Sequence, residues 1–170
     1  MKLLLIVFIG LLFNNSITPS IKNFHQVDQD LFRSAQPNRK EMKELEAFGI
    51  KTILNVRNFI KDDSEIKGTS LVEKRISMRA KTVSYNNLKE ALIAIKHAEK
   101  PVLVHCLHGS DRTGATIAAY RIIFNHWSRE QAIEEFLLPE NGYNAHWFPN
   151  ILNLLQTIDF EQLRKDVEVG

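Results

Sequence analysis

The sequence predicts an α/β fold, in which a mostly parallel central sheet is flanked by helices on both faces. Two observations support this prediction. Strand-like apolar segments alternate along the chain with segments of helical spacing, which is typical of parallel strands joined by helices. The most apolar strand, at 101–105, leads into a loop that begins with a cysteine, and a helix-forming segment follows the loop directly. Such a loop lies at the carboxyl end of a strand, where α/β folds place their sites.

The first half of the chain is expected to supply one helix and two strands. Pro37 suits a first helical turn, and apolar residues at helical spacing follow until Gly49 ends the helix. The apolar run 52–56 predicts a strand, and the polar segment 61–68 predicts a loop with a short helix. A weaker pattern at 73–78 indicates a second strand.

The next predicted helix begins at Asn87. Four residues at helical spacing form its apolar face: Leu88, Ala91, Leu92 and Ile95. The strand at 101–105 follows, and after the loop a helix is expected from Thr113 to about Phe124.

Two more helices complete the predicted domain. Ser128 and Gln131 fit a capping box for a helix at 129–137, and an amphipathic pattern predicts a last helix at 147–158. We find no internal repeat and no linker, so residues 20–170 are predicted to form a single domain.

Length and composition restrict the class of protein. The chain has 170 residues, of which 44% are hydrophobic, and a formal net charge of +2. This length predicts one domain, and the hydrophobic content is sufficient for a core. No basic run and no interleaving of basic and aromatic residues occurs, which argues against a nucleic-acid partner.

Residues 1–19 differ from the rest of the chain. Lys2 is followed by an apolar run, 3–13, and then by polar residues at 14–16. This order is typical of a signal peptide, and the run is shorter than the ~20 apolar residues of a transmembrane helix. We therefore predict export to the periplasm or the exterior. The alternatives are an uncleaved N-terminal anchor, which would be the only membrane contact, and a hydrophobic first element of the domain.

The segment 102–114 carries the most specific chemical signal. Five residues separate Cys106 from Arg112, and Thr-Gly follows the arginine. The strand points the thiol into a cleft, and the loop turns its backbone N–H groups toward one centre at the N-terminus of the next helix. That arrangement binds phosphate, so residues 106–112 are called the phosphate loop below.

Each residue type here has a chemical reason. Cys106 attacks phosphorus only as a thiolate, and N–H dipoles, a helix N-terminus and a guanidinium lower the pKa of a free thiol from ~8.5. Arg112 would grip two phosphate oxygens, and the hydroxyl of Thr113 would donate to the thiolate. His105 is predicted to orient the loop through hydrogen bonds. An inert buried cysteine is the alternative, and it leaves the spaced Arg-Thr-Gly unexplained.

Six residues are predicted to bind the substrate: Leu107, His108, Gly109, Ser110, Thr113 and Gly114. Gly109 and Gly114 allow backbone angles and close helix packing that a side chain would obstruct. No metal and no cofactor is expected.

The pattern His-Cys-x5-Arg-Thr-Gly resembles the signature of the cysteine-dependent protein tyrosine and dual-specificity phosphatases. The compact dual-specificity-like phosphatases of bacteria, fungi and plants are similar at 31–37, 48–57, 120–122 and 127–132. The resemblance implies a hydrolase that forms a cysteinyl-phosphate intermediate. It also implies a phosphorylated substrate, either a protein tyrosine phosphate or an inositol pyrophosphate.

The chain departs from that family where the general acid is usually found. The similar phosphatases carry an aspartate in the segment that corresponds to 78–85, which contains no carboxylate here; Thr82 stands at our best estimate of its position. Asp111, inside the phosphate loop, is one replacement, unless it only hydrogen-bonds Arg112 or a neighbouring backbone group.

A mobile loop that brings Asp62, Asp63 or Glu65 over the site is the second replacement, unless these residues only form a solvated acidic turn. Without a strong acid, the expected substrates have good leaving groups, because a phenol of pKa ~10 leaves more easily than an alcohol of pKa ~15.7, and a phosphate of second pKa ~6 more easily still. Aryl phosphates and pyrophosphate bonds are therefore predicted.

Three further positively charged side chains are candidates for anion binding. Arg57, just past a strand, would either bind a second phosphate or serve as a structural ion-pair partner. Arg79 and Lys81, in the segment that lacks the acid, would contact an anionic substrate.

Two other functions fit part of the sequence. A degenerate phosphatase that binds phosphorylated ligands without turnover would explain the missing aspartate, but it would not require both Cys106 and Arg112. A rhodanese-like sulfurtransferase also places a cysteine at the start of an anion-binding loop, and the Thr113-Gly114 pair disfavours it.

Overall fold

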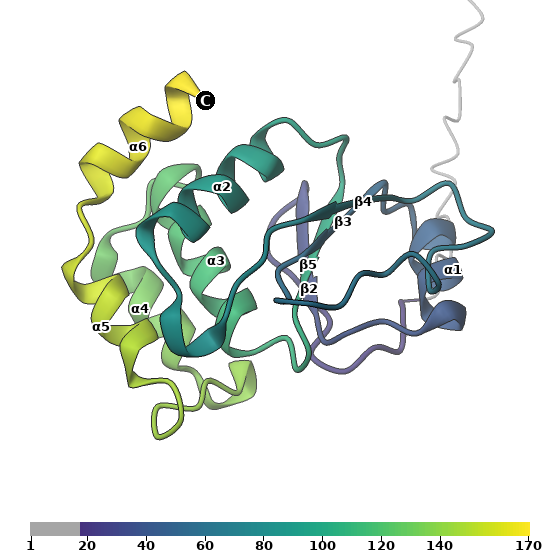
Figure 1. The fold of residues 1–170 in the computed structure, drawn as a ribbon, viewed down its shortest axis with the longest axis horizontal. Coiled ribbons are helices and arrows are strands. Elements are labelled where there is room, and N and C mark those ends of the chain that lie inside the picture. The colour runs from purple at the N-terminus through teal and green to yellow at the C-terminus, as the bar shows by residue number, and fades with distance from the viewer. Residues whose placement is uncertain (1–17) are drawn as a thin grey trace, which may run out of the picture.

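Five strands form one sheet in the computed structural model, which describes residues 18–170 (Figure 1). They are β1 (His25–Gln26), β2 (Leu31–Ser34), β3 (Thr52–Asn55), β4 (Val72–Arg75) and β5 (Val102–His105), in the spatial order β1-β2-β5-β3-β4. β1 runs antiparallel to β2, and the other neighbouring pairs are parallel. The predicted mostly parallel sheet is confirmed, and the strand that precedes the phosphate loop is its centre.

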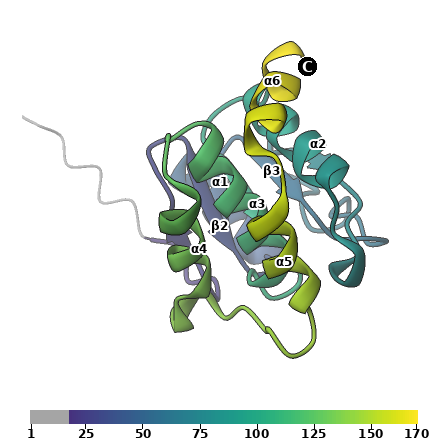
Figure 2. The ribbon, with the colours of Figure 1, turned by 90° about the vertical axis from the view of Figure 1, so that its left-hand side faces the viewer.

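Helices cover both faces of the sheet, as expected, but unequally (Figures 1 and 2). On one face α1 (Arg39–Phe48) packs against Ile53 and Leu103 of the sheet. On the other side, around Leu54 and Val104, lie α2 (Tyr85–Lys96), α3 (Asp111–Ile123), α4 (Arg129–Leu137), α5 (Pro149–Thr157) and α6 (Phe160–Val169). Successive residues of a strand point to opposite faces, so Ile53 and Leu54 belong to different cores.

Side-chain caps decide where the helices begin. Asn38 caps α1, so the predicted start at Pro37 lies outside the helix. Ser84 caps α2, which therefore begins at Tyr85 and not at the predicted Asn87, whose side chain completes the capping box. The predicted capping box of α4 is confirmed.

Other elements differ from the prediction. The segment 61–68 forms turns without the expected short helix, and β4 ends at Arg75, short of the predicted residue 78. The last predicted helix begins at Pro149, and a further helix, α6, follows it behind the cap Asp159. β1, β2 and α6 were not predicted, because β1 is two residues long and the charged residues of α6 mask its apolar spacing.

The predicted export segment, 1–19, lies outside the described residues apart from its last two. Among the helices of residues 18–170, none is both long and apolar enough to cross a membrane. The domain start at residue 20 stays a prediction.

Candidate active site

The phosphate loop joins β5 to α3, at the carboxyl edge of the sheet. Gly109 has a φ of 73°, and a Cβ at this position would lie 2.5 Å from the backbone carbonyl of Ser34. A Cβ on Gly114, in the first turn of α3, would lie 2.8 Å from the ring of Phe136. Both approaches are closer than van der Waals contact allows, so the geometry agrees with the expected need for glycine at each position.

Neighbouring segments hold three backbone carbonyls of the phosphate loop. The carbonyl oxygens of Leu107, His108 and Gly109 accept from the amide of Gln36 (3.2 Å), Nδ2 of Asn23 (2.7 Å) and Nη2 of Arg33 (2.7 Å), respectively. Because these carbonyls are held by other segments, the loop is free to turn amides toward the thiol. Sequence reasoning did not single out Asn23 or Arg33. A lone charged residue within the otherwise uncharged stretch 31–35 is the signal that would have found the latter, which the structure buries.

The thiol of Cys106 is only 2% exposed at the start of the loop. Burial by itself raises the pKa of this thiol. The hydroxyl of Thr113, the charge of Arg112 and the backbone amides of Thr113 and His108 outweigh burial, and the pKa falls below its usual value. The structure thus brings the predicted nucleophile, guanidinium and hydroxyl together.

Two buried polar atoms close to this thiol lack a nitrogen or oxygen partner within residues 18–170. They are Nε of Arg112 and Oγ1 of Thr113. Nη1 of Arg112 donates to the carbonyl oxygen of Met78 at 3.3 Å, which fixes one end of the guanidinium. A bound phosphate would supply acceptors for the rest of this donor set.

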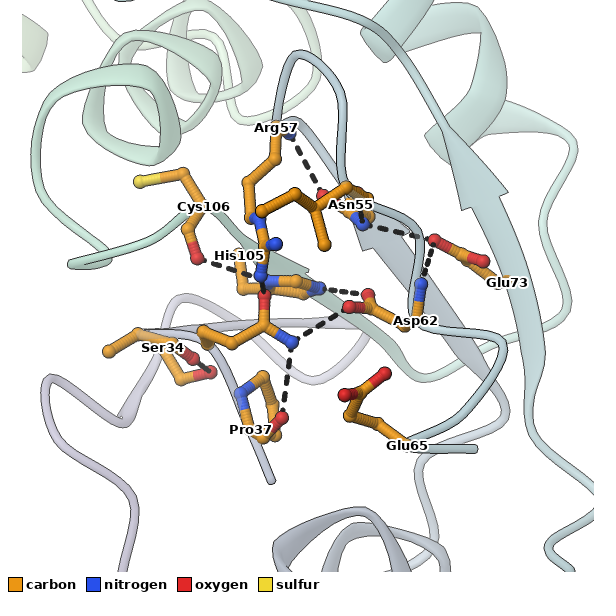
Figure 3. Close-up of polar contacts among 12 residues, drawn as sticks. Ser34, Pro37, Asn55, Arg57, Asp62, Glu65, Glu73, His105 and Cys106 are labelled. Carbon is orange, nitrogen blue, oxygen red and sulfur yellow. Dashed lines mark hydrogen bonds and ion pairs between the residues drawn. The ribbon is translucent and has the colours of Figure 1, made fainter. Parts of the chain in front are cut away.

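A fully buried pair, His105 and Asp62, lies behind the phosphate loop (Figure 3). Nε2 of His105 is 2.7 Å from Oδ2 of Asp62, and Nδ1 is 3.1 Å from the carbonyl oxygen of Cys106. The geometry agrees with the predicted role of His105, which orients the loop through hydrogen bonds.

More polar side chains surround this pair (Figure 3). Nε2 of Gln36 donates to Oδ1 of Asp62 at 2.7 Å, and Nη1 of Arg57 donates to Oε1 of Gln36. Oε1 of Glu73 accepts from the backbone amide of Asp62 at 3.1 Å and from Nδ2 of Asn55 at 3.0 Å. Arg57 is buried in this cluster, which favours its structural role over the binding of a second phosphate.

The structure gives the candidate general acids different surroundings. Asp111 is 8% exposed, and its Oδ1 accepts from the backbone amide of Asn144 at 2.9 Å, which matches the hydrogen-bonding alternative for this residue. Asp62 is fully buried in contact with His105, so it is not part of an exposed mobile loop. Asp63 is exposed, and Glu65 accepts from a neighbouring serine hydroxyl. Figure 3 shows Asp62 and Glu65 lying apart from the sulfur of Cys106.

The segment that should carry the acid reaches the site without a carboxylate. It follows Met78, whose carbonyl contacts Arg112, and forms the short 3-10 helix η1 (Ala80–Thr82). The side chains of Arg79, Lys81 and Thr82 are exposed there. Two cations and a hydroxyl therefore stand where an acid was expected.

A pocket of 540 Å³ opens beside the phosphate loop, between His108, Ser110 and the exposed Trp147. A second pocket of 560 Å³, lined by Lys100 and Tyr120, includes no loop residue. The first pocket borders the loop at His108, Ser110 and Asp111, and its lining includes neither Cys106 nor Arg112. Within residues 18–170, no group of three or more His, Cys, Asp or Glu side chains is arranged to hold a metal ion.

Comparison with known proteins shows which family has this sequence. The sequence model of the family described as "Tyrosine phosphatase family" matches residues 17–148 of the chain. The dual specificity protein phosphatase TpbA of Pseudomonas aeruginosa PAO1 is 34% identical over 124 residues, which cover 71% of this chain and 55% of TpbA. The chain thus spans about half the length of this curated relative.

Two further relatives extend the comparison. The crystal structure of a cysteine-to-serine variant of TpbA in complex with pTyr superposes with a TM-score of 0.80 at 26% identity, covering 91% of this chain and 94% of that one. The inositol diphosphatase DSP3 of Arabidopsis thaliana is 20% identical over 161 residues, which cover 89% of this chain and 77% of DSP3.

Proposed function

Because the chain belongs to the tyrosine phosphatase family, we propose that it is a phosphatase that works through a cysteinyl-phosphate intermediate. One observation carries the proposal: the thiol of Cys106 has a lowered pKa, accepts from the hydroxyl of Thr113 and lies beside a guanidinium whose Nε has no acceptor within residues 18–170. An inert structural cysteine would not need these neighbours, since burial alone raises the pKa of a thiol.

The geometry supports a two-step transfer. The thiolate of Cys106 attacks phosphorus, a sulfur–phosphorus bond forms, and the bond to the leaving oxygen breaks. Arg112 and the loop amides bind the equatorial phosphate oxygens, where negative charge is held in the transition state. Water then attacks phosphorus, the sulfur–phosphorus bond breaks, and the thiolate returns with the hydroxyl of Thr113 donating to it.

The proposed substrates are phosphotyrosine-like aryl phosphates and inositol pyrophosphates. The relatives point to both, because TpbA was crystallised with pTyr and DSP3 is named an inositol diphosphatase. The absence of a carboxylate at 79–82 favours leaving groups that need little protonation. The exposed Arg79 and Lys81 would attract a leaving group that carries further phosphates.

The first experiment measures phosphate release from an aryl phosphate and from an inositol pyrophosphate. Wild type is compared with Cys106→Ser and with Asp63→Asn, an exposed change that controls for the handling of variants. Turnover that the serine variant loses supports the proposal. Turnover that survives the serine variant, or phosphate release from neither substrate by wild type, overturns it.

A leaving-group series tests the acid. The second-order rate constant is measured on aryl phosphates whose phenols differ in pKa. Without an acid the rate falls steeply as the phenol pKa rises, and with an acid the dependence is shallow. If Asp111 is that acid, Asp111→Asn steepens the dependence and removes the basic limb of the pH profile; an unchanged slope assigns Asp111 to its bond with Asn144.

A phospho-ligand binding module is the second candidate function. The cations at Arg79 and Lys81, in place of an acid, are the observation that favours it. Such a module would bind an aryl phosphate stoichiometrically without releasing phosphate, which isothermal calorimetry beside the release assay distinguishes from turnover.

We further propose that the chain is exported, on the basis of Lys2 and the apolar run 3–13. The test fuses an alkaline phosphatase reporter, which folds only outside the bacterial cytoplasm, after residue 170. Reporter activity with the full sequence, and its loss when residues 1–19 are removed, is the expected result. An inactive reporter on the full sequence contradicts export.

A further inference from the structure

We propose that Asp62 is a positioning residue for the nucleophile: its carboxylate holds His105 as a doubly protonated imidazolium, directly behind the phosphate loop. The inference concerns how Cys106 is kept ionised, and so it rests on the proposed function. It gives Asp62 a task that differs from that of a mobile general acid. The task is electrostatic, exerted through His105, and involves no contact with the substrate.

The hydrogen bonds of His105 require a proton on each ring nitrogen. Nδ1 lies 3.1 Å from the carbonyl oxygen of Cys106, and Nε2 lies 2.7 Å from Oδ2 of Asp62. A carbonyl oxygen and an ionised carboxylate can only accept, whereas a neutral imidazole has a single N–H. A neutral ring would leave one of these contacts without a proton, in a position where both side chains are fully buried.

The carboxylate of Asp62 is held in its ionised form. Burial by itself raises the pKa of this carboxyl. The hydrogen bond and charge of His105, the hydrogen bond of Gln36 and the charge of Arg57 outweigh burial, so the pKa lies below its usual range. Gln36 and Arg57 act independently of His105, and both favour the carboxylate over the alternative pair, in which a protonated Asp62 donates to a neutral His105.

The surrounding charges come from four parts of the chain. They are Arg57, Asp62 and Glu65 in the segment between β3 and β4, Glu73 on β4, Cys106 in the phosphate loop, and Arg112 on α3. Glu73 is occupied by Asn55 and by the backbone amide of Asp62, and Arg57 by Gln36. The acceptor that faces the His105 ring is therefore Asp62.

An imidazolium at this place would act on the nucleophile in two ways. Its N–H at Nδ1 fixes the peptide group of Cys106, and with it the direction in which the following amides point. Its positive charge, next to Cys106 along the chain, favours the thiolate over the thiol. Arg112 and Thr113 act on the same sulfur from α3, so the thiolate is supported by two elements.

Asp62→Asn isolates the charge from the hydrogen bonds. The asparagine oxygen can still accept from Gln36, and its Nδ2 can donate to Nε2 of a neutral His105, whose Nδ1–H still reaches the carbonyl of Cys106. Every contact of the pair is kept while the imidazolium loses its counter-charge. Asp63→Asn, one residue away and exposed, removes the same formal charge and is the matched control.

The experiment titrates the thiolate by its ultraviolet absorbance. Cys106 is the only cysteine of the sequence, so the difference spectrum against Cys106→Ser reports this thiol alone. We expect Asp62→Asn to raise the thiol pKa by about one unit, a tenfold loss in the ratio of thiolate to thiol. Asp63→Asn should titrate as wild type does, and the acidic limb of the activity profile should move with the thiol pKa.

A second measurement needs no variant of Asp62. In nitrogen-15 spectra of histidine-labelled wild type, both ring nitrogens of His105 should carry protons near neutral pH, identified by the signals absent from His105→Asn. A neutral His105, or an Asp62→Asn thiol that titrates as in wild type, overturns the inference. A shifted thiol pKa in a protein that releases no phosphate would leave the inference standing and refute the proposed function, so the two failures are distinguishable.

Discussion

The two sides of the phosphate loop differ in how completely their buried polar atoms are hydrogen-bonded. Toward α3, Nε of Arg112 is buried without a partner in residues 18–170, and the hydroxyl of Thr113 has only the thiol of Cys106. Toward the strands, His105 uses both ring nitrogens and Asp62 accepts at both carboxylate oxygens. A buried polar atom without a partner costs about 1–3 kcal/mol. The first side is therefore arranged to be completed by an anion, whereas the His105–Asp62 pair is complete in itself.

This difference separates the residues that support turnover from those that stabilise the folded protein. Changes on the α3 side should reduce turnover while the protein stays folded, because those side chains have few partners to lose. Changes on the strand side should reduce the free energy of unfolding, because each removed group leaves a buried partner unpaired.

The largest effect is expected from Cys106→Ser. A serine hydroxyl does not ionise near neutral pH, so kcat should fall on the order of 10⁴-fold or more. The loop amides and Arg112 remain, and the variant should still bind inorganic phosphate. Steady-state kinetics and calorimetry check the two statements, and a variant that loses phosphate binding together with turnover would show that the thiol also builds the cradle.

Asp62→Ala should have the largest effect on stability. Removal of one partner of a buried ion pair costs about 3–5 kcal/mol, whereas Asp63→Ala should unfold close to wild type. The pKa of Asp62 is lowered on folding, so its contribution is complete well above the ordinary value of 3.8 and is lost as the pH falls through the folded value. Denaturant unfolding at neutral and acidic pH should therefore show the difference between wild type and Asp62→Ala shrinking in acid. A constant difference would mean that the ionised carboxylate is not its source.

Arg112→Lys is expected to reduce turnover without reducing stability. Lysine cannot form the planar two-pronged contact with phosphate, so kcat/KM should fall about 10²–10³-fold. The free energy of unfolding should change little, and Arg39→Lys on α1 should keep wild-type kinetics. A loss of stability that matched the loss of activity would place Arg112 with the scaffold instead.

Gly114→Ala should have the smallest effect. The new methyl would press on the ring of Phe136, 2.8 Å away, and overpacking of this kind costs about 1–3 kcal/mol. Phe136→Leu should relieve part of that cost, so the double variant should be more stable than the sum of the single changes predicts. Additive losses would show that the methyl is accommodated without the ring.

Prediction from sequence succeeded where the residues within one short segment determine its structure. The apolar strand 101–105, the spaced Cys106 and Arg112, and the capping box of α4 are all local patterns, and the structure forms the corresponding elements. It failed at β1, which is two residues long, and at β4, an edge strand whose ends are defined by its pairing with β3. Strand ends of this kind depend on a partner that is distant in sequence.

The sequence by itself therefore determined the α/β class, and it predicted the phosphate loop and the residues that react in it. Only the tertiary structure decided the place of the acidic residues, because their function depends on neighbours that are far away along the chain. Asp62 and Asp63 look alike in the sequence. In the structure Asp62 is buried in contact with His105, 43 residues away, whereas Asp63 is exposed. Burial changes the chemistry of a carboxylate through desolvation and through the partners that it then requires, and no local pattern encodes either of these.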